Sequence, residues 1–175
     1  MTAEQLLTAD LHGIGEPRGE EHGQAQLIRD SWAEVEPDVE EMGRLFYATL
    51  FRIAPEARDL FPVNMEVQRS RLMRALVHFV QMIDQPDELV PFLEQLGRDH
   101  RKFGVVAQHY DAVGESLFTA IATWGGATVW TPAVRDAWTD AYAALAGHMQ
   151  TAAQAERGPA SWLGRVVAHE RLGWD

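Results

Sequence analysis

The chain has 175 residues, enough for one domain with a single hydrophobic core, and a formal net charge of −11. A charge of that sign opposes binding to nucleic acid or anionic membranes, and no apolar run approaches the roughly 18 residues of a membrane span. The absence of cysteine excludes disulfides, thiolate nucleophiles and cysteine-held metals, and it fits a reducing compartment. We therefore expect a soluble, cytoplasmic protein.

The expected elements are helices, because apolar residues recur with helical spacing along most of the chain. Residues 1–22 show no sustained period and are expected to form a flexible tail, followed by one domain over residues 23–157. In chain order, the apolar stripes are Leu27, Ile28, Ser31, Trp32 and Val35; Val39, Met42, Phe46, Leu50 and Ile53; Gln68, Leu72, Leu76, Phe79 and Ile83; Leu89, Leu93, Leu96 and His100; Tyr110, Val113, Leu117, Ile121 and Trp124; Trp138, Tyr142, Leu145 and Met149. This pattern predicts an all-α fold.

Local signals mark where these helices begin and end. Pro55 opens a short turn, Asn64 can cap the next helix, and Gly104 stops the helix that carries His100. Thr131 caps the last helix, whose first position is taken by proline. We also expect the glycines in "TWGG" to terminate the helix before it.

The segment 158–175 differs from the rest, because "WLGRVVAHERLGWD" is rich in valine and aromatic residues and resembles a strand. A single strand is not stable alone in water. We therefore interpret this segment as a linker and the first strand of a second domain.

Several polar residues are expected to point inward. His100 ends an otherwise apolar stripe, and Gln68 lies on the core side of another. Tyr47 and Phe61 could join them, the first as a polar group and the second as a ring that clamps a flat ligand. Because buried polar groups need partners, their convergence indicates a bound polar object, although a histidine on an apolar face is more often a core residue.

These residues also carry a family resemblance. "LFYATLFRIAPEARDLF", "QRSRLMRAL" and "DHRKFGVVAQHYDAVGE" resemble bacterial globins of the flavohaemoglobin and single-domain haemoglobin branch, over about residues 24–157. The resemblance implies a globin fold that holds haem b, with His100 as the proximal iron ligand. It also implies a distal tyrosine, Tyr47, and a distal glutamine, Gln68. The other residues it assigns to the haem pocket are Phe61, Leu72, Leu96, Val106, Tyr110 and Val113.

The implied activity is that of a nitric oxide dioxygenase, which combines dioxygen and nitric oxide to give nitrate, with Tyr47, Gln68 and Tyr110 as the catalytic side chains. O2, NO and CO are the expected iron ligands. The tail "SWLGRVVAHERLGWD" resembles the start of a reductase domain, so FAD and NAD(P)H would belong to the parent protein or to a partner reductase.

The resemblance departs from the family in the last helix, where Ala155 stands at the position of a glutamate that would complete a proximal network with His100 and Tyr110. Glu156 is adjacent, but neighbouring helical residues point about 100° apart. Among the other histidines, we expect His109 to be exposed, and we interpret His78 and His148 as structural or solvent-facing.

Three other functions remain open: an oxygen carrier or store, a gas sensor with an output domain, and a globin-like module without haem. A strand-like tail argues against the sensor, whose linkers are usually helical. A carboxylate-bridged metal bundle is excluded, because such sites need a glutamate three residues before a histidine and no histidine in the sequence has one.

Overall fold

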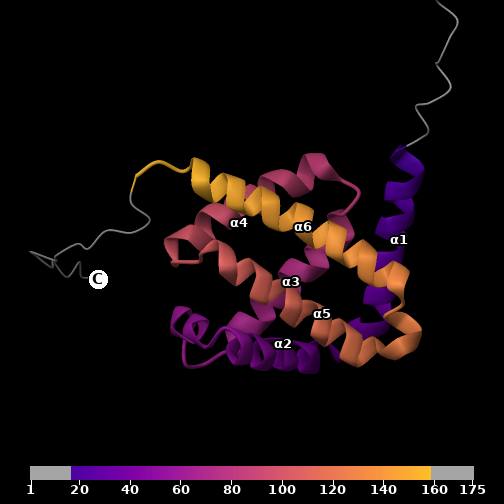
Figure 1. Ribbon diagram of the computed structural model, residues 1–175, viewed down its shortest axis with the longest axis horizontal. Helices are drawn as coiled ribbons and strands as arrows, with labels where there is room; N and C mark the ends of the chain where they lie inside the picture. The colour runs from indigo at the N-terminus through magenta and orange to yellow at the C-terminus, as the bar shows by residue number, and fades with distance from the viewer. Residues whose placement is uncertain (1–16, 159–175) are drawn as a thin grey trace, which may run out of the picture.

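The computed structural model describes residues 17–158, and every regular element in this range is a helix (Figure 1). The α-helices are α1 Pro17–Val35, α2 Val39–Ile53, α3 Glu66–Met82, α4 Pro86–Lys102, α5 Ala107–Val129 and α6 Pro132–Ala155. Two short 3₁₀ helices, η2 Glu36–Asp38 and η3 Pro55–Leu60, flank α2. The all-α prediction is confirmed.

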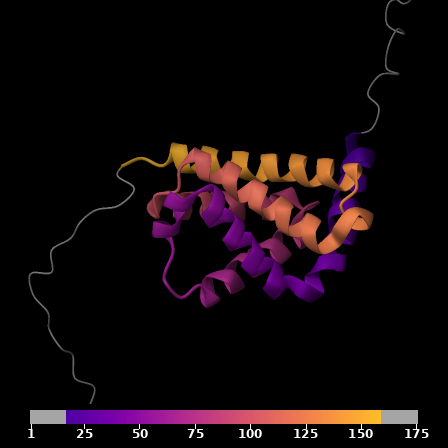
Figure 2. The ribbon, with the colours of Figure 1, turned by 60° about the horizontal axis from the view of Figure 1, so that its bottom comes forward.

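The helices pack at several crossing angles around one core. α4 packs against α6, and α2 packs against α5 and α3. In both ribbon views α1 crosses the N-terminal end of α6 (Figures 1 and 2). Within the described range, no helix is both long enough and apolar enough to span a membrane.

The crossing of α1 and α6 depends on a buried polar contact. The indole N–H of Trp138 donates to the Ser31 hydroxyl at 3.0 Å, and that hydroxyl lies 2.8 Å from the carbonyl oxygen of Leu27, to which it donates. Trp138 and Ser31 are both buried. Pairing these groups removes the cost of placing them in the core, which explains a serine within an apolar stripe.

Three of the expected local signals lie at helix ends in the structure, although the N-cap position of α3 is Met65, one residue after Asn64. The Thr131 side chain accepts a hydrogen bond from the backbone N–H of Val134 at 3.3 Å, and Asn64 accepts one from that of Glu66 at 2.9 Å. α4 ends just before Gly104, whose φ of 82° lies in the left-handed region that glycine tolerates.

Two boundaries differ from the sequence expectation. α1 begins at Pro17, so residues 17–22 are helical and the predicted end of the N-terminal tail at residue 22 is wrong. α5 continues to Val129 beyond the expected stop at "TWGG", although Gly126 interrupts it with a non-helical φ of 60°. Apart from Gly158, the predicted linker and strand lie outside the described residues.

A glycine sets how closely α4 approaches α6. Gly97 lies against the backbone of Met149, and a Cβ at this position would overlap the Met149 carbonyl oxygen. The two helices can therefore approach only because residue 97 has no side chain. His100 follows about one turn later on α4, so this contact also helps to fix the position of its imidazole.

Candidate functional site

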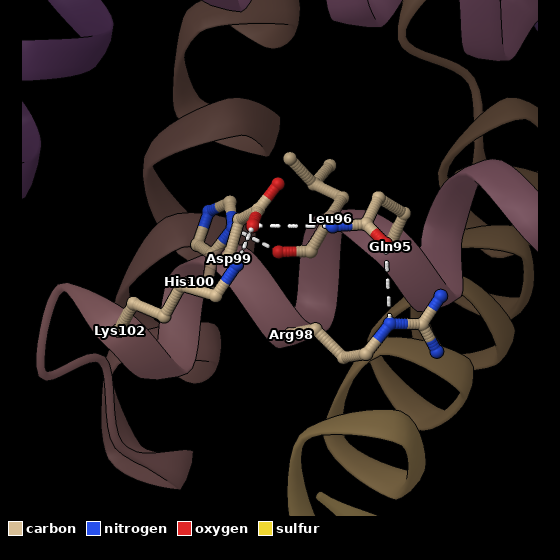
Figure 3. A network of polar contacts seen from close by, with 6 residues as sticks. All are labelled: Gln95, Leu96, Arg98, Asp99, His100 and Lys102. Atoms are coloured by element: carbon tan, nitrogen blue, oxygen red, sulfur yellow. Dashed lines mark hydrogen bonds and ion pairs between the residues drawn. The ribbon is translucent and has the colours of Figure 1, made fainter. Parts of the chain in front are cut away.

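The imidazole of His100 is held by its own helix. Its Nδ1 lies 2.7 Å from the carbonyl oxygen of Leu96, one turn earlier on α4 (Figure 3). Because a carbonyl oxygen can only accept, Nδ1 carries the proton and Nε2 keeps its lone pair. Burial lowers the pKa of His100, which the Leu96 hydrogen bond and the nearby Asp99 carboxylate partly oppose. The ring is therefore neutral near pH 7 and can offer Nε2 to a metal.

Tyr110 lies beside this histidine. The ring centroids of His100 and Tyr110 are 6.4 Å apart, with 34° between the ring planes. The Tyr142 hydroxyl on α6 donates to the Tyr110 carbonyl oxygen at 2.6 Å, which ties α6 to the first turn of α5. This approach requires Gly114, because a Cβ there would lie 2.7 Å from Cε1 of Tyr142. Leu96, His100 and Tyr110 form what we call the proximal group.

A second cluster surrounds Tyr47 on α2, which is 5% exposed. The rings of Tyr47 and Phe61 meet edge to face at 5.5 Å between centroids, and Phe51 packs against both. Burial raises the pKa of Tyr47, and a side-chain hydrogen bond with Gln68 and the charge of Arg69 oppose this shift. The phenol therefore remains protonated at neutral pH and can donate. Tyr47, Phe61 and Gln68 form what we call the distal group.

η3 links the two groups. The Glu56 carboxylate on η3 lies 3.9 Å from Nε2 of His109 at the start of α5, and a Cβ at Gly104 would lie 3.8 Å from a methyl carbon of Leu60. η3 runs directly into Phe61, whereas Gly104 and His109 adjoin the proximal group. The fold thus brings the two groups to the same part of the molecule.

The apolar side chains near these groups fit a flat hydrophobic ligand. Among the described residues, four large apolar side chains are exposed: Val63 at 94%, Phe103 at 70%, Val67 at 58% and Val106 at 48%. Two of them lie at or just before the start of α3, and two lie between α4 and α5. Leu72 and Val113, both expected to contact haem, are half-buried against the core.

Together these residues offer a neutral imidazole with a free nitrogen, a protonated phenol and uncovered apolar surface. That set fits haem, which needs an axial nitrogen ligand and an apolar enclosure.

The expectation that His109 is exposed is wrong. Its side chain is buried, with 8% of the residue exposed, and its Nδ1 accepts a hydrogen bond from the backbone N–H of Val106 at 3.2 Å. His109 occupies the third position of α5, where a side chain can reach back to cap the helix. The sequence signal for this cap was the three-residue spacing between Val106 and His109. Histidine is an unusual residue in this capping role.

The remaining candidates are less central. His78 is half-buried with its ring against Phe92 at 4.7 Å, and His148 is exposed, which agrees with their structural and solvent-facing interpretation. Ala155 ends α6 and is exposed, as is Glu156. Within residues 17–158, Glu156 makes no hydrogen bond or ion pair, so it does not complete a network with Tyr110.

Sequence reasoning missed two arginines near the distal group. Arg58 donates to the carbonyl oxygens of Phe61 and Pro62 at 3.1 and 3.2 Å, and it lies over the Phe51 ring. Arg69 follows Gln68 directly, and its charge acts on Tyr47. Arginines on a helix usually face solvent, so the sequence held no signal that set these two apart.

A helical fold that holds a histidine and a tyrosine in this way is compatible with a haem-binding α-helical protein. The globin family profile matches residues 44–149, more than half of the sequence, and the chain belongs to the globin family. Membership of this family implies that it binds haem.

Individual relatives agree with this assignment. The flavohemoprotein of Bacillus subtilis (strain 168) is 29% identical over 124 residues, which cover 69% of this chain and 31% of that protein. An engineered carbene transferase, derived from a candidate nitric oxide dioxygenase of Rhodothermus marinus, has a TM-score of 0.66 and 30% identity over 75% of this chain and 91% of its own. A bacterial globin from Campylobacter jejuni shares the fold, with a TM-score of 0.66 and 24% identity over 76% of this chain and 96% of its own.

Proposed function

We propose that this chain is the haem domain of a nitric oxide dioxygenase of the flavohaemoglobin type. The observation that carries the proposal is the state of the His100 imidazole, whose Nδ1 is hydrogen-bonded to Leu96 while Nε2 has no hydrogen-bond partner among the described residues. His100 would hold haem b from the proximal side, and Phe61, Leu72, Leu96, Val106 and Val113 would enclose it. When bound, the haem iron supplies the position at which dioxygen and nitric oxide combine to give nitrate.

On the distal side, Tyr47 would present its O–H to the partial negative charge that dioxygen acquires in the pocket. A donor fixed in a water-poor site stabilises such charge more than water does. Gln68 would hold the Tyr47 hydroxyl in place through their hydrogen bond, and Phe61 would keep the phenol from rotating away. O2, NO and CO are the ligands that we expect such a haem to take.

On the proximal side, the Leu96 carbonyl would increase the electron donation of His100, because a hydrogen bond to the far ring nitrogen makes the imidazole more basic. Tyr110 would keep the imidazole plane in place through its neighbouring ring, and its own position depends on Tyr142.

Turnover would need an electron source. The chain matches only 31% of the length of the Bacillus subtilis flavohemoprotein. We propose that residues 158–175 lead into a reductase domain, or that a separate reductase serves the chain, with electrons passing from NAD(P)H through FAD. A cytoplasmic location follows from this requirement and agrees with the lack of cysteine.

A second candidate is an oxygen carrier or store without catalysis. It is favoured by the exposed Ala155 and Glu156, which leave His100 and Tyr110 without a carboxylate partner from the end of α6. A less basic proximal imidazole would favour reversible binding over activation.

Two measurements test the proposal. Purified protein supplied with haem should show an intense Soret band that shifts with dithionite and again with carbon monoxide, whereas a colourless protein would overturn haem binding. The reduced, aerated protein should then consume nitric oxide and form nitrate in equal amounts. Stable oxygen binding without nitrate formation would favour the carrier.

Substituting Tyr47→Phe tests the distal assignment. Removing a hydrogen bond to a charged group should speed oxygen dissociation roughly tenfold or more, while carbon monoxide, which carries little charge, should change much less. Stopped-flow dissociation rates for both gases give this ratio. Equal changes for the two gases would contradict the assignment.

A further inference from the structure

Arg69 lies where α3 crosses α2, in the first turn of α3 and directly after Gln68. Its aliphatic stem packs against Gly43, since a Cβ at Gly43 would lie 3.8 Å from the Arg69 Cδ. Gly43 is itself buried. The arginine stem thus passes between the two helices that carry the distal group, instead of extending directly into solvent.

The guanidinium group of Arg69 has a hydrogen-bond donor without an acceptor. Arg69 Nε is buried and has no partner, and within residues 17–158 the guanidinium makes no ion pair. By contrast, Arg58 on the same side of the molecule is bonded to two carbonyl oxygens. A buried charged donor without an acceptor is costly, and an acceptor supplied from outside the chain is one way to remove that cost.

The charge of Arg69 also acts on the distal tyrosine, where it favours the anionic form of the Tyr47 hydroxyl and partly opposes the rise in its pKa that burial causes. Glu66, one turn earlier on α3, is exposed and makes no ion pair with Arg69 among the described residues. The positive charge is therefore not neutralised by a carboxylate on its own helix. The Tyr47 phenol, which packs edge to face against Phe61, is thus hydrogen-bonded to the Gln68 side chain and lies within the electrostatic reach of Arg69.

We propose that Arg69 makes the distal side of the pocket selective for small anions, so that anionic ligands of the haem bind more tightly than their size alone would give. The inference rests on the proposed function, because it needs haem to supply the ligand position. The chemical class is a compact, singly charged anion of two to four heavy atoms, which includes both azide and nitrate. Arg69 acts here as a positioning charge next to Tyr47 and Gln68.

The test compares an anion with a neutral ligand in the haem-loaded full chain. Azide is titrated into the ferric protein and carbon monoxide into the ferrous protein, at one neutral pH and one ionic strength. Arg69→Met keeps an apolar stem over Gly43 and removes the charge. It should weaken azide binding about fivefold, the effect expected of one partly screened charge, and leave carbon monoxide affinity within about twofold.

A matched control is Arg71→Met on the same helix, which removes the same charge from an exposed position. It should leave azide affinity within about twofold, and Arg69→Lys should retain most of the original affinity. The Tm of Arg69→Met should stay equal or rise, because the substitution removes an unpaired buried donor.

Azide affinity that is unchanged in Arg69→Met, or that falls as far in Arg71→Met or in Arg69→Lys, would overturn the inference. These results would leave the proposed function intact, because haem uptake and nitrate formation by the unaltered protein are measured separately. A chain that takes up no haem would overturn both.

Discussion

His100 and His109 differ in what their ring nitrogens contact. In His100 the Nδ1 N–H donates to the Leu96 carbonyl, and Nε2 has no hydrogen-bond partner within residues 17–158. In His109 the Nδ1 lone pair accepts from the N–H of Val106, so the proton is on Nε2, which faces Glu56. His109 could not bind a metal through either nitrogen without losing one of these contacts. The structure thus gives a chemical reason to choose His100.

His100→Ala should therefore increase the rate of haem loss by at least about tenfold, because metal affinity typically falls by at least this factor when a residue that supports the metal is removed. His109→Ala removes a helix cap and should cost about 1 kcal/mol of unfolding free energy, with haem loss unchanged within about twofold. Transfer of haem to excess apomyoglobin measures the first quantity, and urea unfolding measures the second. If His109→Ala lost haem faster than His100→Ala, the ligand assignment would be wrong.

The contact between α4 and α6 is the element-scale feature that most directly supports the site. Gly97 permits this contact, and His100, the proposed haem ligand, follows on the same helix. α6 supports the site a second time through the hydrogen bond from Tyr142 to Tyr110. The proximal group is thus held by α6 at two places, although no residue of α6 belongs to it.

Gly97→Ala should destabilise the fold by about 1–3 kcal/mol, because α4 must move away from the Met149 backbone. It should also shift the Soret band, since His100 moves with α4. Gly147→Ala on α6 is the matched control, because a Cβ there meets nothing within 4 Å. That substitution should stabilise the helix by up to about 1 kcal/mol. Equal unfolding midpoints for the two variants would contradict the close crossing.

Burial of tyrosine is a property of the whole molecule, because all three tyrosines of the chain lie in or beside the site. Burial raises the pKa of Tyr47, Tyr110 and Tyr142 above the ordinary value of 10.0. The folded state therefore keeps these protons at a pH where the unfolded state releases them. Below pH 10 both states are protonated and the three groups leave stability unchanged with pH.

As the pH rises above 10, the unfolded state loses protons first, so the free energy of unfolding should fall. The phenolate absorbance should accordingly appear together with the loss of helical circular dichroism. A tyrosine that titrated near pH 10 in fully folded protein would show that at least one of the three is more exposed than the structure indicates.

The sequence by itself determined the elements and most of their ends, but not the start of α1 or the end of α5. Helical spacing identified the stripes, and Thr131, Asn64 and Gly104 act through backbone groups within a few residues, so their effect does not depend on the rest of the fold. The same stripes placed His100 and Gln68 toward the core. Family resemblance then supplied the role of each site residue, which spacing alone could not.

The tertiary structure decided which of these residues meet. The pairing of Tyr47 with Gln68, the burial of His109, the contact of Gly97 with Met149 and the unpaired Arg69 Nε all involve residues from different helices or a packing environment that several helices create. Helical periodicity records which face of a helix is apolar, but it does not record which other helix covers that face or at what angle. Those choices depend on how side chains fit across the whole core.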